Sequence, residues 1–295
     1  MAEESEAEEK AEEAKPPHPH HHPSREEIRK QIEREKEEIE KRLENVEHVL
    51  VVMSGKGGVG KTTVTVNLAL CLAEDADVGV LDLDIHGPNV PEQLGVDRPP
   101  QASPAGLFPV KGYRDVKVVS IGTMLEDRNL PVLWRGPRKS GFIREVLVKT
   151  QWGDLDYLIV DMPPGTGDEI MTGLEMLPER ARNVLLVTSP ESMAHSDVVK
   201  AGEAVKRMDG NLLGVVSNMH GIICPECDSL IEYFTEDHSE ELAERLGVEV
   251  LARIPLDPEA KLRSEEEGKP MVLAAPDSRA AEAFQELAER VKEEL

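Results

Sequence analysis

Seven short apolar runs, rich in valine, isoleucine and leucine, constrain the fold of this 295-residue chain more than any other feature. Strands that are apolar throughout, rather than alternately apolar and polar, have neither face in water, which is typical of a parallel sheet covered by helices on both faces. Helical stretches separate several of the runs. We therefore expect an α/β fold with a doubly wound, mainly parallel sheet that binds its ligand at the carboxyl ends of the strands. The runs lie at residues 48–53, 78–81, 117–121, 157–160, 183–187, 213–216 and 249–252.

Composition divides the chain into three segments. Residues 1–23 combine a Glu/Ala/Lys run with a Pro/His-rich stretch, and they carry too little apolar surface to offset the entropy of ordering, so we expect a disordered, acidic and histidine-rich tail. Residues 24–47 open with a capping box, Ser24 with Glu27, and predict a charged amphipathic helix. Its narrow apolar stripe favours packing on the body or on a partner helix over burial in a core. Residues 48–295 are expected to form one domain.

The balance of charge and the cysteine content limit the classes of function. The formal net charge is −24, so sequence-independent binding of nucleic acid or of anionic membranes is disfavoured. Three cysteines are too few for a disulfide framework and fit a reducing compartment. The first residues lack the basic and apolar regions of a secretory signal, and no apolar stretch approaches the ~18–20 residues that cross a bilayer. We expect a cytoplasmic protein with no nucleic-acid or membrane partner.

The sequence GKGGVGKT at residues 55–62 directly follows the first apolar run and matches the phosphate-binding pattern G-x-x-x-x-G-K-[ST] at every fixed position. Glycines let backbone N–H groups curl around phosphates, and the helix that begins near Lys61 adds the positive end of its dipole. Lys61 is expected to neutralise the β- and γ-phosphates, and the Thr62 hydroxyl to bind Mg²⁺. The chain is therefore predicted to be a P-loop NTPase that binds ATP or ADP. The predicted nucleotide-binding residues here are Gly55, Lys56, Gly57, Gly58, Val59, Gly60, Lys61, Thr62 and Thr63.

Carboxylates end two of the other apolar runs. Asp161 is expected to lie beside Mg²⁺ with Thr62. Asp84 is our candidate for orienting the attacking water and a further candidate for the Mg²⁺ site. Asp82 is interpreted as structural, because alternation along a strand points it away from Asp84. The loop at residues 162–168 is a candidate sensor of the γ-phosphate.

The C-x-x-C pair, Cys224 and Cys227, lies in a loop at residues 220–230 and has several interpretations on spacing alone. The two thiols could join His220 and His238 in a structural zinc site, because a tetrahedral Cys₂His₂ set is standard for zinc. They could instead form a redox dithiol, or hold part of an iron–sulfur cluster. The third cysteine, Cys71, lies in an apolar helical stretch and is interpreted as a small buried hydrophobe.

Lys56 makes the phosphate-binding motif more specific. The sequence KGGVGKTT that begins at Lys56 resembles the deviant Walker A box of the MinD/ParA-type ATPases. That resemblance implies a sandwich homodimer in which Lys56 reaches the phosphates bound by the other subunit, much as an arginine finger is supplied in trans. The predicted catalytic residues are then Lys56, Lys61, Asp84 and Asp161.

Further segments closely resemble the Mrp/ApbC family of iron–sulfur cluster carrier ATPases over roughly residues 48–275. They are DLDIHGPNVP at 82–91, WRGPRKSG at 134–141, DMPPGTGD at 161–168, GVVSNM at 214–219 and CPEC at 224–227. The resemblance implies that Asn218 and the backbone around Pro255 contact adenine. It also implies that Cys224 and Cys227 hold a 4Fe-4S cluster for transfer to apo iron–sulfur proteins. Such a cluster normally takes four thiolates, so one chain supplies half of them and the expected cluster bridges a homodimer.

The competing function is a MinD/ParA-type regulatory or positioning ATPase, with Zn²⁺ held structurally at Cys224 and Cys227. A membrane-positioning ATPase is expected to end in a basic amphipathic helix, whereas the helix predicted at residues 278–295 is acidic. A DNA-partition ATPase needs clustered lysine and arginine, and no such cluster stands out. A nucleotide-regulated scaffold without turnover is a third possibility.

Overall fold

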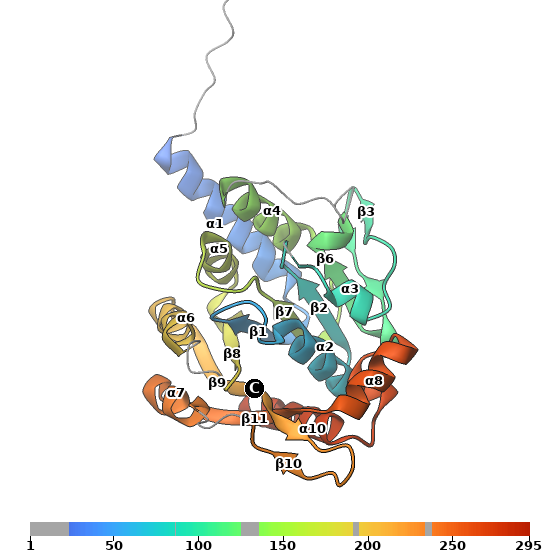
Figure 1. Ribbon diagram of the computed structural model, residues 1–295. Coiled ribbons are helices and arrows are strands. Elements are labelled where there is room, and N and C mark those ends of the chain that lie inside the picture. Colours follow the sequence, from blue (N-terminus) through green and yellow to red (C-terminus); the bar gives the residue numbers. More distant parts are fainter. Residues whose placement is uncertain (1–23, 86, 125–135, 191–194, 234–237) are drawn as a thin grey trace, which may run out of the picture.

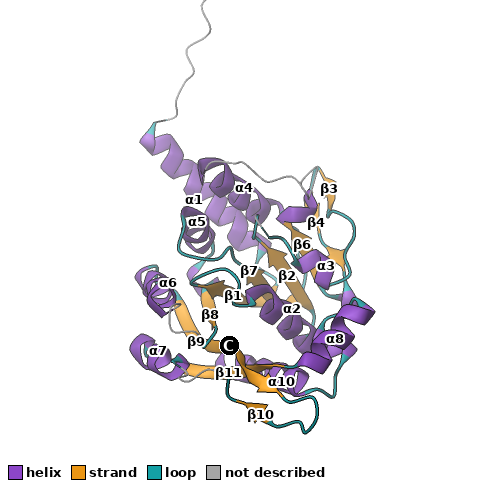
Figure 2. Cartoon of the chain, in the orientation of Figure 1, coloured by secondary structure: helices purple, strands orange, loops and turns teal. Residues whose placement is uncertain are grey.

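The computed structural model describes residues 24–85, 87–124, 136–190, 195–233 and 238–295. The predicted disordered tail at residues 1–23 lies outside these residues, as does the start of the 134–141 segment. Within the described part, nine strands form one sheet in the order β10-β9-β8-β1-β7-β2-β6-β5, and β11 pairs with β9. Helices lie on both sides of this sheet (Figure 2). The predicted α/β fold is therefore confirmed.

Each of the seven predicted strands is present, and these seven run parallel to one another. The largest difference concerns β9, which continues to Ile223 instead of ending near residue 216. Parallel strands are β1 (Val46–Ser54), β2 (Val78–Asp82), β6 (Lys117–Ser120), β7 (Leu155–Asp161), β8 (Asn183–Thr188), β9 (Asn211–Ile223) and β11 (Glu249–Leu256). Antiparallel additions are β5 (Val110–Lys111), β10 (Leu230–Ile231) and the separate hairpin of β3 (Gln101–Ser103) and β4 (Gly106–Phe108).

Two apolar cores, one on each face, explain why the strands are apolar throughout. Val51 and Val160 point into one core, whereas their neighbours Val52 and Ile159 point into the other. The first core lies under α1 (Arg25–Arg42), α4 (Gly136–Lys149), α5 (Asp168–Met176), α6 (His195–Arg207) and α7 (Ser239–Leu246). The second lies under α2 (Lys61–Leu72), α3 (Val90–Gln93), α9 (Met271–Ala274) and α10 (Arg279–Glu294), beside α8 (Pro258–Glu267) (Figure 1). Short 3₁₀ helices are η1 (Tyr113–Asp115), η2 (Ile121–Met124) and η3 (Glu179–Ala181).

Helix α1 packs on the body more deeply than its narrow apolar stripe predicted. Its capping box is present, with Ser24 Oγ accepting a hydrogen bond from the backbone N–H of Glu27. The second half of the helix belongs to the core, since Ile39 has no exposed surface. The Arg180 guanidinium holds the end of the helix by donating to the carbonyl oxygen of Leu43 at 2.9 Å. The first half projects from the body (Figure 1), and Ile28 is 46% exposed.

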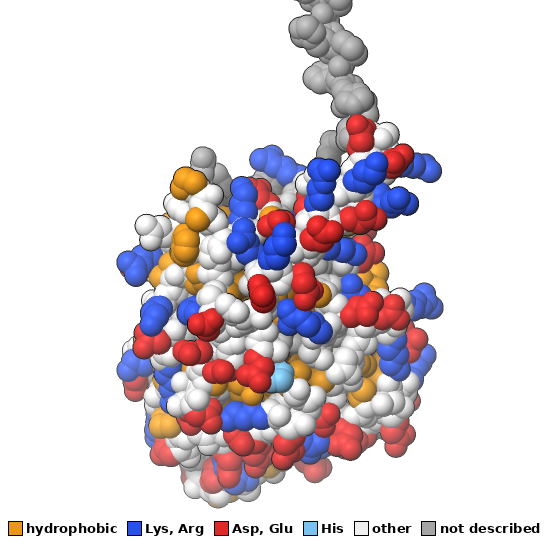
Figure 3. Space-filling view, turned by 180° about the vertical axis from the view of Figure 1, so that it is seen from behind, with side chains coloured by type: hydrophobic (Ala, Val, Ile, Leu, Met, Phe, Trp, Pro, Cys, Tyr) orange, Lys and Arg blue, Asp and Glu red, His pale blue; other side chains and the backbone are white. Residues whose placement is uncertain are grey.

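Charged side chains of both signs are interspersed on the face seen from behind (Figure 3). Several make ion pairs along a helix, such as Lys30 with Glu26 at 2.7 Å and Lys149 with Glu145 at 2.6 Å. Pairs as exposed as these contribute little to stability, so the fold depends chiefly on the two apolar cores. None of the described helices combines the length and the apolar character that crossing a bilayer requires.

The burial of α1 predicts a measurable difference between its two halves. Ile39→Ala is expected to lower the free energy of unfolding by about 2–5 kcal/mol, because it leaves a cavity in a core that is otherwise filled. Ile28→Ala on the same helix is expected to change it by no more than about 0.5 kcal/mol, because that side chain is largely in water. Urea unfolding of both variants tests this, and equal effects would show that α1 does not belong to the core.

Candidate functional site

The loop at residues 55–60 leaves the carboxyl end of β1, which lies between β7 and β8 in the sheet. Gly60 has φ +79°, a left-handed conformation, and a Cβ added there would lie 2.2 Å from Asn218 Nδ2. A Cβ on Gly55 would lie 2.4 Å from the backbone nitrogen of Val198 on α6. Glycine is therefore required at both ends of the loop, which is held closely between β9 and α6. Lys56, within the loop, is half-buried.

Lys61, Thr62 and Asp161 meet at the start of α2, as the sequence predicted. The Lys61 Nζ lies 2.7 Å from Asp161 Oδ1, and both side chains are almost completely buried. Thr62 Oγ1 donates to Asp161 Oδ2 at 2.8 Å. Thr65 Oγ1 donates to Asp161 Oδ1 at 2.7 Å. Thr65 was not among the residues predicted from the sequence, although it follows Lys61 by one helical turn and so shares a face with it.

This cluster suits Mg²⁺ and phosphate. Mg²⁺ prefers oxygen ligands and keeps several of its waters, and it is commonly held by one or two protein oxygens together with phosphate oxygens. Thr62 and Asp161 place a hydroxyl and a carboxylate together at the first turn of a helix whose dipole favours anions. The residues present therefore fit a magnesium nucleotide. When bound, the ion would neutralise charge on the phosphate oxygens.

Asp82 and Asp84 lie beyond this cluster at the same edge of the sheet. Asp82 is opposite Asp161 in the ladder between β2 and β7, and it has no exposed surface. Its carboxyl group accepts hydrogen bonds from Ser120 Oγ at 2.8 Å and from the backbone N–H of Asp84 at 3.0 Å. Burial, followed by the negative charge of Asp161, raises the pKa of Asp82 to about 8. Asp84 is mostly buried, and its Oδ1 accepts from the backbone N–H of Gly87 at 3.2 Å.

A cavity of about 840 Å³ opens beside the loop. Asn218 and Pro255, the predicted adenine contacts, both line it, and Thr63 lies at its phosphate-binding end. Asn218 Nδ2 donates to the carbonyl oxygen of Val59 at 2.9 Å, so this side chain links β9 to the loop. Much of the remaining wall is apolar and suits the face of a flat base: Met219, Ile222, Leu256, Pro270 and Met271.

Cys224 and Cys227 occupy a tight turn between β9 and β10. The backbone N–H of Cys224 donates to the carbonyl oxygen of Ser229, and that of Asp228 donates to the carbonyl oxygen of Cys224, each at 2.9 Å. Cys227 Sγ lies 3.0 Å from Ser229 Oγ, and this hydrogen bond is the main cause that lowers the pKa of the Cys227 thiol. Cys227 is exposed and Cys224 is half-buried. Cys71, in contrast, lies in the core, where burial raises its pKa to about 12.

A second cavity, of about 320 Å³, lies against the cysteine turn. Asp257 and Pro258 line both cavities, so the N-cap and first residue of α8 form a wall between the larger cavity, the candidate nucleotide cavity, and the thiols. Asp257 caps α8, and its Oδ1 accepts from the backbone N–H of Ala260 at 3.0 Å. Strand β9 provides a second connection, because it carries Asn218 and leads directly to Cys224.

The described residues do not assemble the zinc site considered from the sequence. Among the residues that the structure describes, no three histidine, cysteine, aspartate or glutamate side chains are grouped so that they could hold a metal ion. His238 instead begins α7, where its Nδ1 lies 3.4 Å from Glu241 Oε2. The described residues of one chain therefore offer two thiols at this turn.

The raised pKa of Asp82 predicts a pH-dependent effect of Asp82→Asn in the nucleotide-free protein. The ordinary pKa is 3.8, so between about pH 4 and pH 8 the folded state holds this proton more tightly than the unfolded chain does. The stability contributed by Asp82 is therefore lost as the pH rises through this window. Asparagine stays neutral, so the variant should gain stability relative to wild type between pH 5 and pH 8.

Urea unfolding at three pH values measures this gain. Asp209→Asn, the same chemical change at an exposed position, is the control and should differ from wild type equally at each pH. A constant difference between Asp82→Asn and wild type would show that Asp82 is already ionised in the folded protein.

Comparison with known proteins shows the family to which the chain is related. The family model described as NUBPL iron-transfer P-loop NTPase matches residues 45–292. An iron–sulfur cluster carrier protein from Methanocaldococcus jannaschii is 44% identical over 259 residues, which are 87% of this chain and 88% of that protein. A cytosolic Fe-S cluster assembly factor, the Nubp2 homologue of Anopheles gambiae, is 41% identical over 83% of this chain and 96% of its own length.

Solved structures of similar proteins support the same family relationship. A nucleotide-binding protein from Archaeoglobus fulgidus in complex with ADP has a TM-score of 0.71 and 34% identity, over 84% of this chain and 96% of that chain. The cell division ATPase MinD of Pyrococcus furiosus has a TM-score of 0.63 and 26% identity, over 84% of this chain and 99% of that one. The predicted resemblances to cluster carriers and to MinD-type ATPases are thus confirmed, and the chain belongs to the family of NUBPL-type iron-transfer P-loop NTPases.

Proposed function

We propose that the protein binds and hydrolyses ATP, binds a 4Fe-4S cluster across a homodimer and transfers that cluster to apo iron–sulfur proteins in the cytoplasm. The observation that carries this proposal is the exposed Cys224–Cys227 turn at the end of the strand that also lines the nucleotide cavity. The names of the relatives support cluster delivery as the outcome.

For the nucleotide, each residue has a distinct role in the proposal. Lys61 neutralises the β- and γ-phosphates, while Thr62, Asp161 and Asp84 supply oxygen atoms to the Mg²⁺ site. Asp84 also orients the attacking water. Asn218 and the backbone around Pro255 hold the adenine in the cavity that they both line. Lys56 of each subunit reaches the phosphates bound by the other, so that hydrolysis depends on dimerisation.

The homodimer follows from the thiol count. A cubane cluster normally takes four thiolates. Two copies of this chain, related by a two-fold axis through the cluster, would each supply Cys224 and Cys227 and so provide all four. The surface beside the turn supports such a contact, because three large apolar side chains of the same hairpin are strongly exposed: Leu230 at 44%, Ile231 at 48% and Tyr233 at 67%. An exposed apolar patch of this kind favours a protein interface.

Coupling between the two sites has a short physical route. Nucleotide in the larger cavity would touch the wall at Asp257 and Pro258, whose other side faces the cysteine turn. It would also touch Asn218, on the strand that leads into Cys224. In our proposal, ATP binding and hydrolysis change the position of the cysteine turn through these two elements and so control how the cluster is loaded or released.

The second candidate is a MinD/ParA-type regulatory ATPase with zinc shared by two cysteine turns, and the similarity to MinD favours it. In the described structure, however, the apolar face of α10 is buried, with Phe284 and Leu287 in the core. A C-terminal helix used in this way is not available to lie on a membrane. Zinc at the cysteine turn remains an outcome of the experiment that follows.

Anaerobic reconstitution with iron and sulfide tests the cluster. About four irons and four sulfides per dimer are expected for wild type, and none for Cys224→Ala/Cys227→Ala. Cys71→Ala is the matched control, because that thiol lies in the core, and it should keep the full content. Iron, sulfide and zinc analysis with a visible spectrum gives the readout. Tightly held zinc without cluster uptake would instead support the regulatory ATPase.

Lys56→Ala tests the contribution of the partner subunit to hydrolysis. The steady-state ATPase rate is expected to fall by roughly 10³-fold, which is the lower end of the effect of a charge supplied in trans. The affinity for ATP, measured by calorimetry, should change little because Lys61 and the loop backbone remain. An unchanged rate would show that Lys56 does not reach the partner's phosphates.

A further inference from the structure

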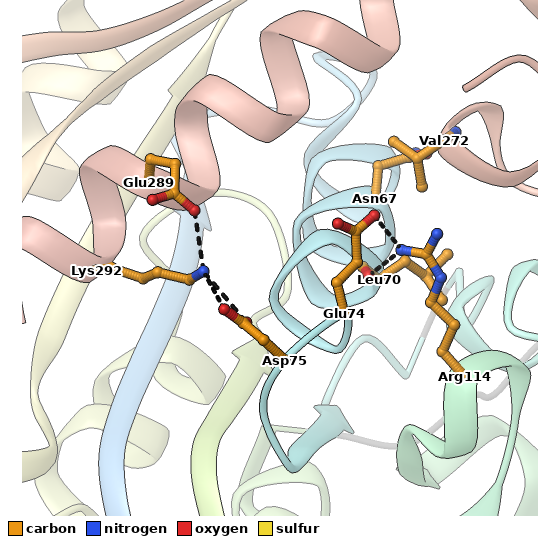
Figure 4. A network of polar contacts seen from close by, with 8 residues as sticks. All are labelled: Asn67, Leu70, Glu74, Asp75, Arg114, Val272, Glu289 and Lys292. Carbon is orange, nitrogen blue, oxygen red and sulfur yellow. Dashed lines mark hydrogen bonds and ion pairs between the residues drawn. The ribbon is translucent and has the colours of Figure 1, made fainter. Parts of the chain in front are cut away.

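Three side-chain contacts fix helix α2, which carries Lys61 and Thr62 at its start, to distant parts of the chain (Figure 4). Arg114 Nη1 donates to the carbonyl oxygen of Leu70 at 2.6 Å, and it lies 2.8 Å from Glu74 Oε1. Lys292 on α10 pairs with Asp75, just beyond the end of the helix, at 3.1 Å. The third contact, that of Asn67 with the backbone of Val272, differs from these two because Asn67 also lines the nucleotide cavity.

The Asn67 amide uses both of its ends. Its Nδ2 donates to the carbonyl oxygen of Thr63 at 2.8 Å, and its Oδ1 accepts from the backbone N–H of Val272 at 3.1 Å. The side chain is 1% exposed. Val272 belongs to the first turn of α9, whose N-cap, Pro270, provides no side-chain hydrogen bond. Asn67 therefore satisfies a backbone donor that the short helix cannot satisfy itself.

The two partners of this amide belong to two parts of the chain that line one cavity, helix α2 and the segment that leads into α9. Thr63 belongs to the phosphate-binding end, two residues after Lys61. Val272 directly follows Pro270 and Met271, which form part of the apolar wall that suits the base. A ligand with phosphates at one end and a flat base at the other must fit the separation of these two parts. The Asn67 amide joins them through two short hydrogen bonds.

We infer that Asn67 is a positioning residue for the nucleotide: it holds the base-side wall at Pro270 and Met271 at a fixed place relative to the phosphate-binding start of α2. The inference rests on the proposed binding of ATP in this cavity. Asn67 acts through the wall and α2, and it takes no part in the chemical step. Asn218 and Pro255 are the predicted contacts of the base, whereas Asn67 fixes the position of the wall that the base packs against.

Only an amide provides a donor and an acceptor in this geometry. Asn67→Leu keeps a similar volume but leaves the Val272 N–H buried without an acceptor, and Asn67→Ala removes both the volume and the hydrogen bonds. If hydrogen bonding positions the wall, the two variants should behave alike. If side-chain volume alone matters, only Asn67→Ala should differ from wild type.

The test compares ATP with inorganic tripolyphosphate, both with Mg²⁺, by calorimetry and by the ligand-induced rise in Tm up to millimolar concentrations. Both Asn67 variants should bind ATP about tenfold more weakly, equivalent to about 1.4 kcal/mol, while their affinity for tripolyphosphate stays within about twofold of wild type. The difference arises because tripolyphosphate does not touch the base-side wall. Equal weakening of the two ligands, or no weakening of ATP, would overturn the inference.

Arg114→Ala is the matched control, since it removes another contact of α2 that does not line the cavity. It should lower Tm without changing the ratio of the two affinities. Amide hydrogen exchange gives a second readout that needs no ligand: the Val272 amide should exchange faster in Asn67→Leu than in wild type or Arg114→Ala. Unchanged exchange there would also contradict the inference. If wild type itself fails to bind ATP, the proposed function fails instead.

Discussion

The buried ion pair between Lys61 and Asp161 is the interaction on which the site depends. The Lys61 Nζ and Asp161 Oδ1 atoms are 2.7 Å apart, and the pair joins the first turn of α2 to the end of β7. Removing one partner would leave the other charged and almost completely buried, which costs far more than the pair itself contributes. Thr62 and Thr65 complete the surroundings of the carboxylate, because each donates a hydrogen bond to it.

The other parts of the site extend from this fixed point along elements that the fold places side by side. Strand β9 runs past the loop, contributes Asn218 and ends at the cysteine turn, while the start of α8 separates the nucleotide cavity from that turn. The nucleotide site and the two thiols of the cysteine turn thus share a strand and a wall. In our proposal this proximity links the two ligands, because Asp257 and Pro258 line both cavities.

Much of this could be predicted from the sequence, because strong local patterns identify it. The seven parallel strands are apolar throughout, and this pattern predicted the sheet. The glycine-rich loop has fixed spacing, and it predicted the cluster of Lys61, Thr62 and Asp161. The short strands β3, β4, β5 and β10 were missed, since two or three residues carry no periodicity. Ser120 and Asn67 were missed for another reason: each acts through one hydrogen bond to a residue far away in the chain, and no spacing reveals such a partner. The depth at which Ile39 is buried likewise depends on the surface that α4 and α5 offer to α1.

Control of cluster delivery by nucleotide is tested most directly by the rate of transfer from the reconstituted protein to an apo 4Fe-4S acceptor. The rate should be measured anaerobically with ATP, with ADP and without nucleotide, for wild type and for Lys61→Ala. Nucleotide control predicts that ATP changes the wild-type rate and that Lys61→Ala, which lacks the phosphate-binding lysine, does not respond. A rate that is the same under all three conditions and unchanged in Lys61→Ala would contradict it.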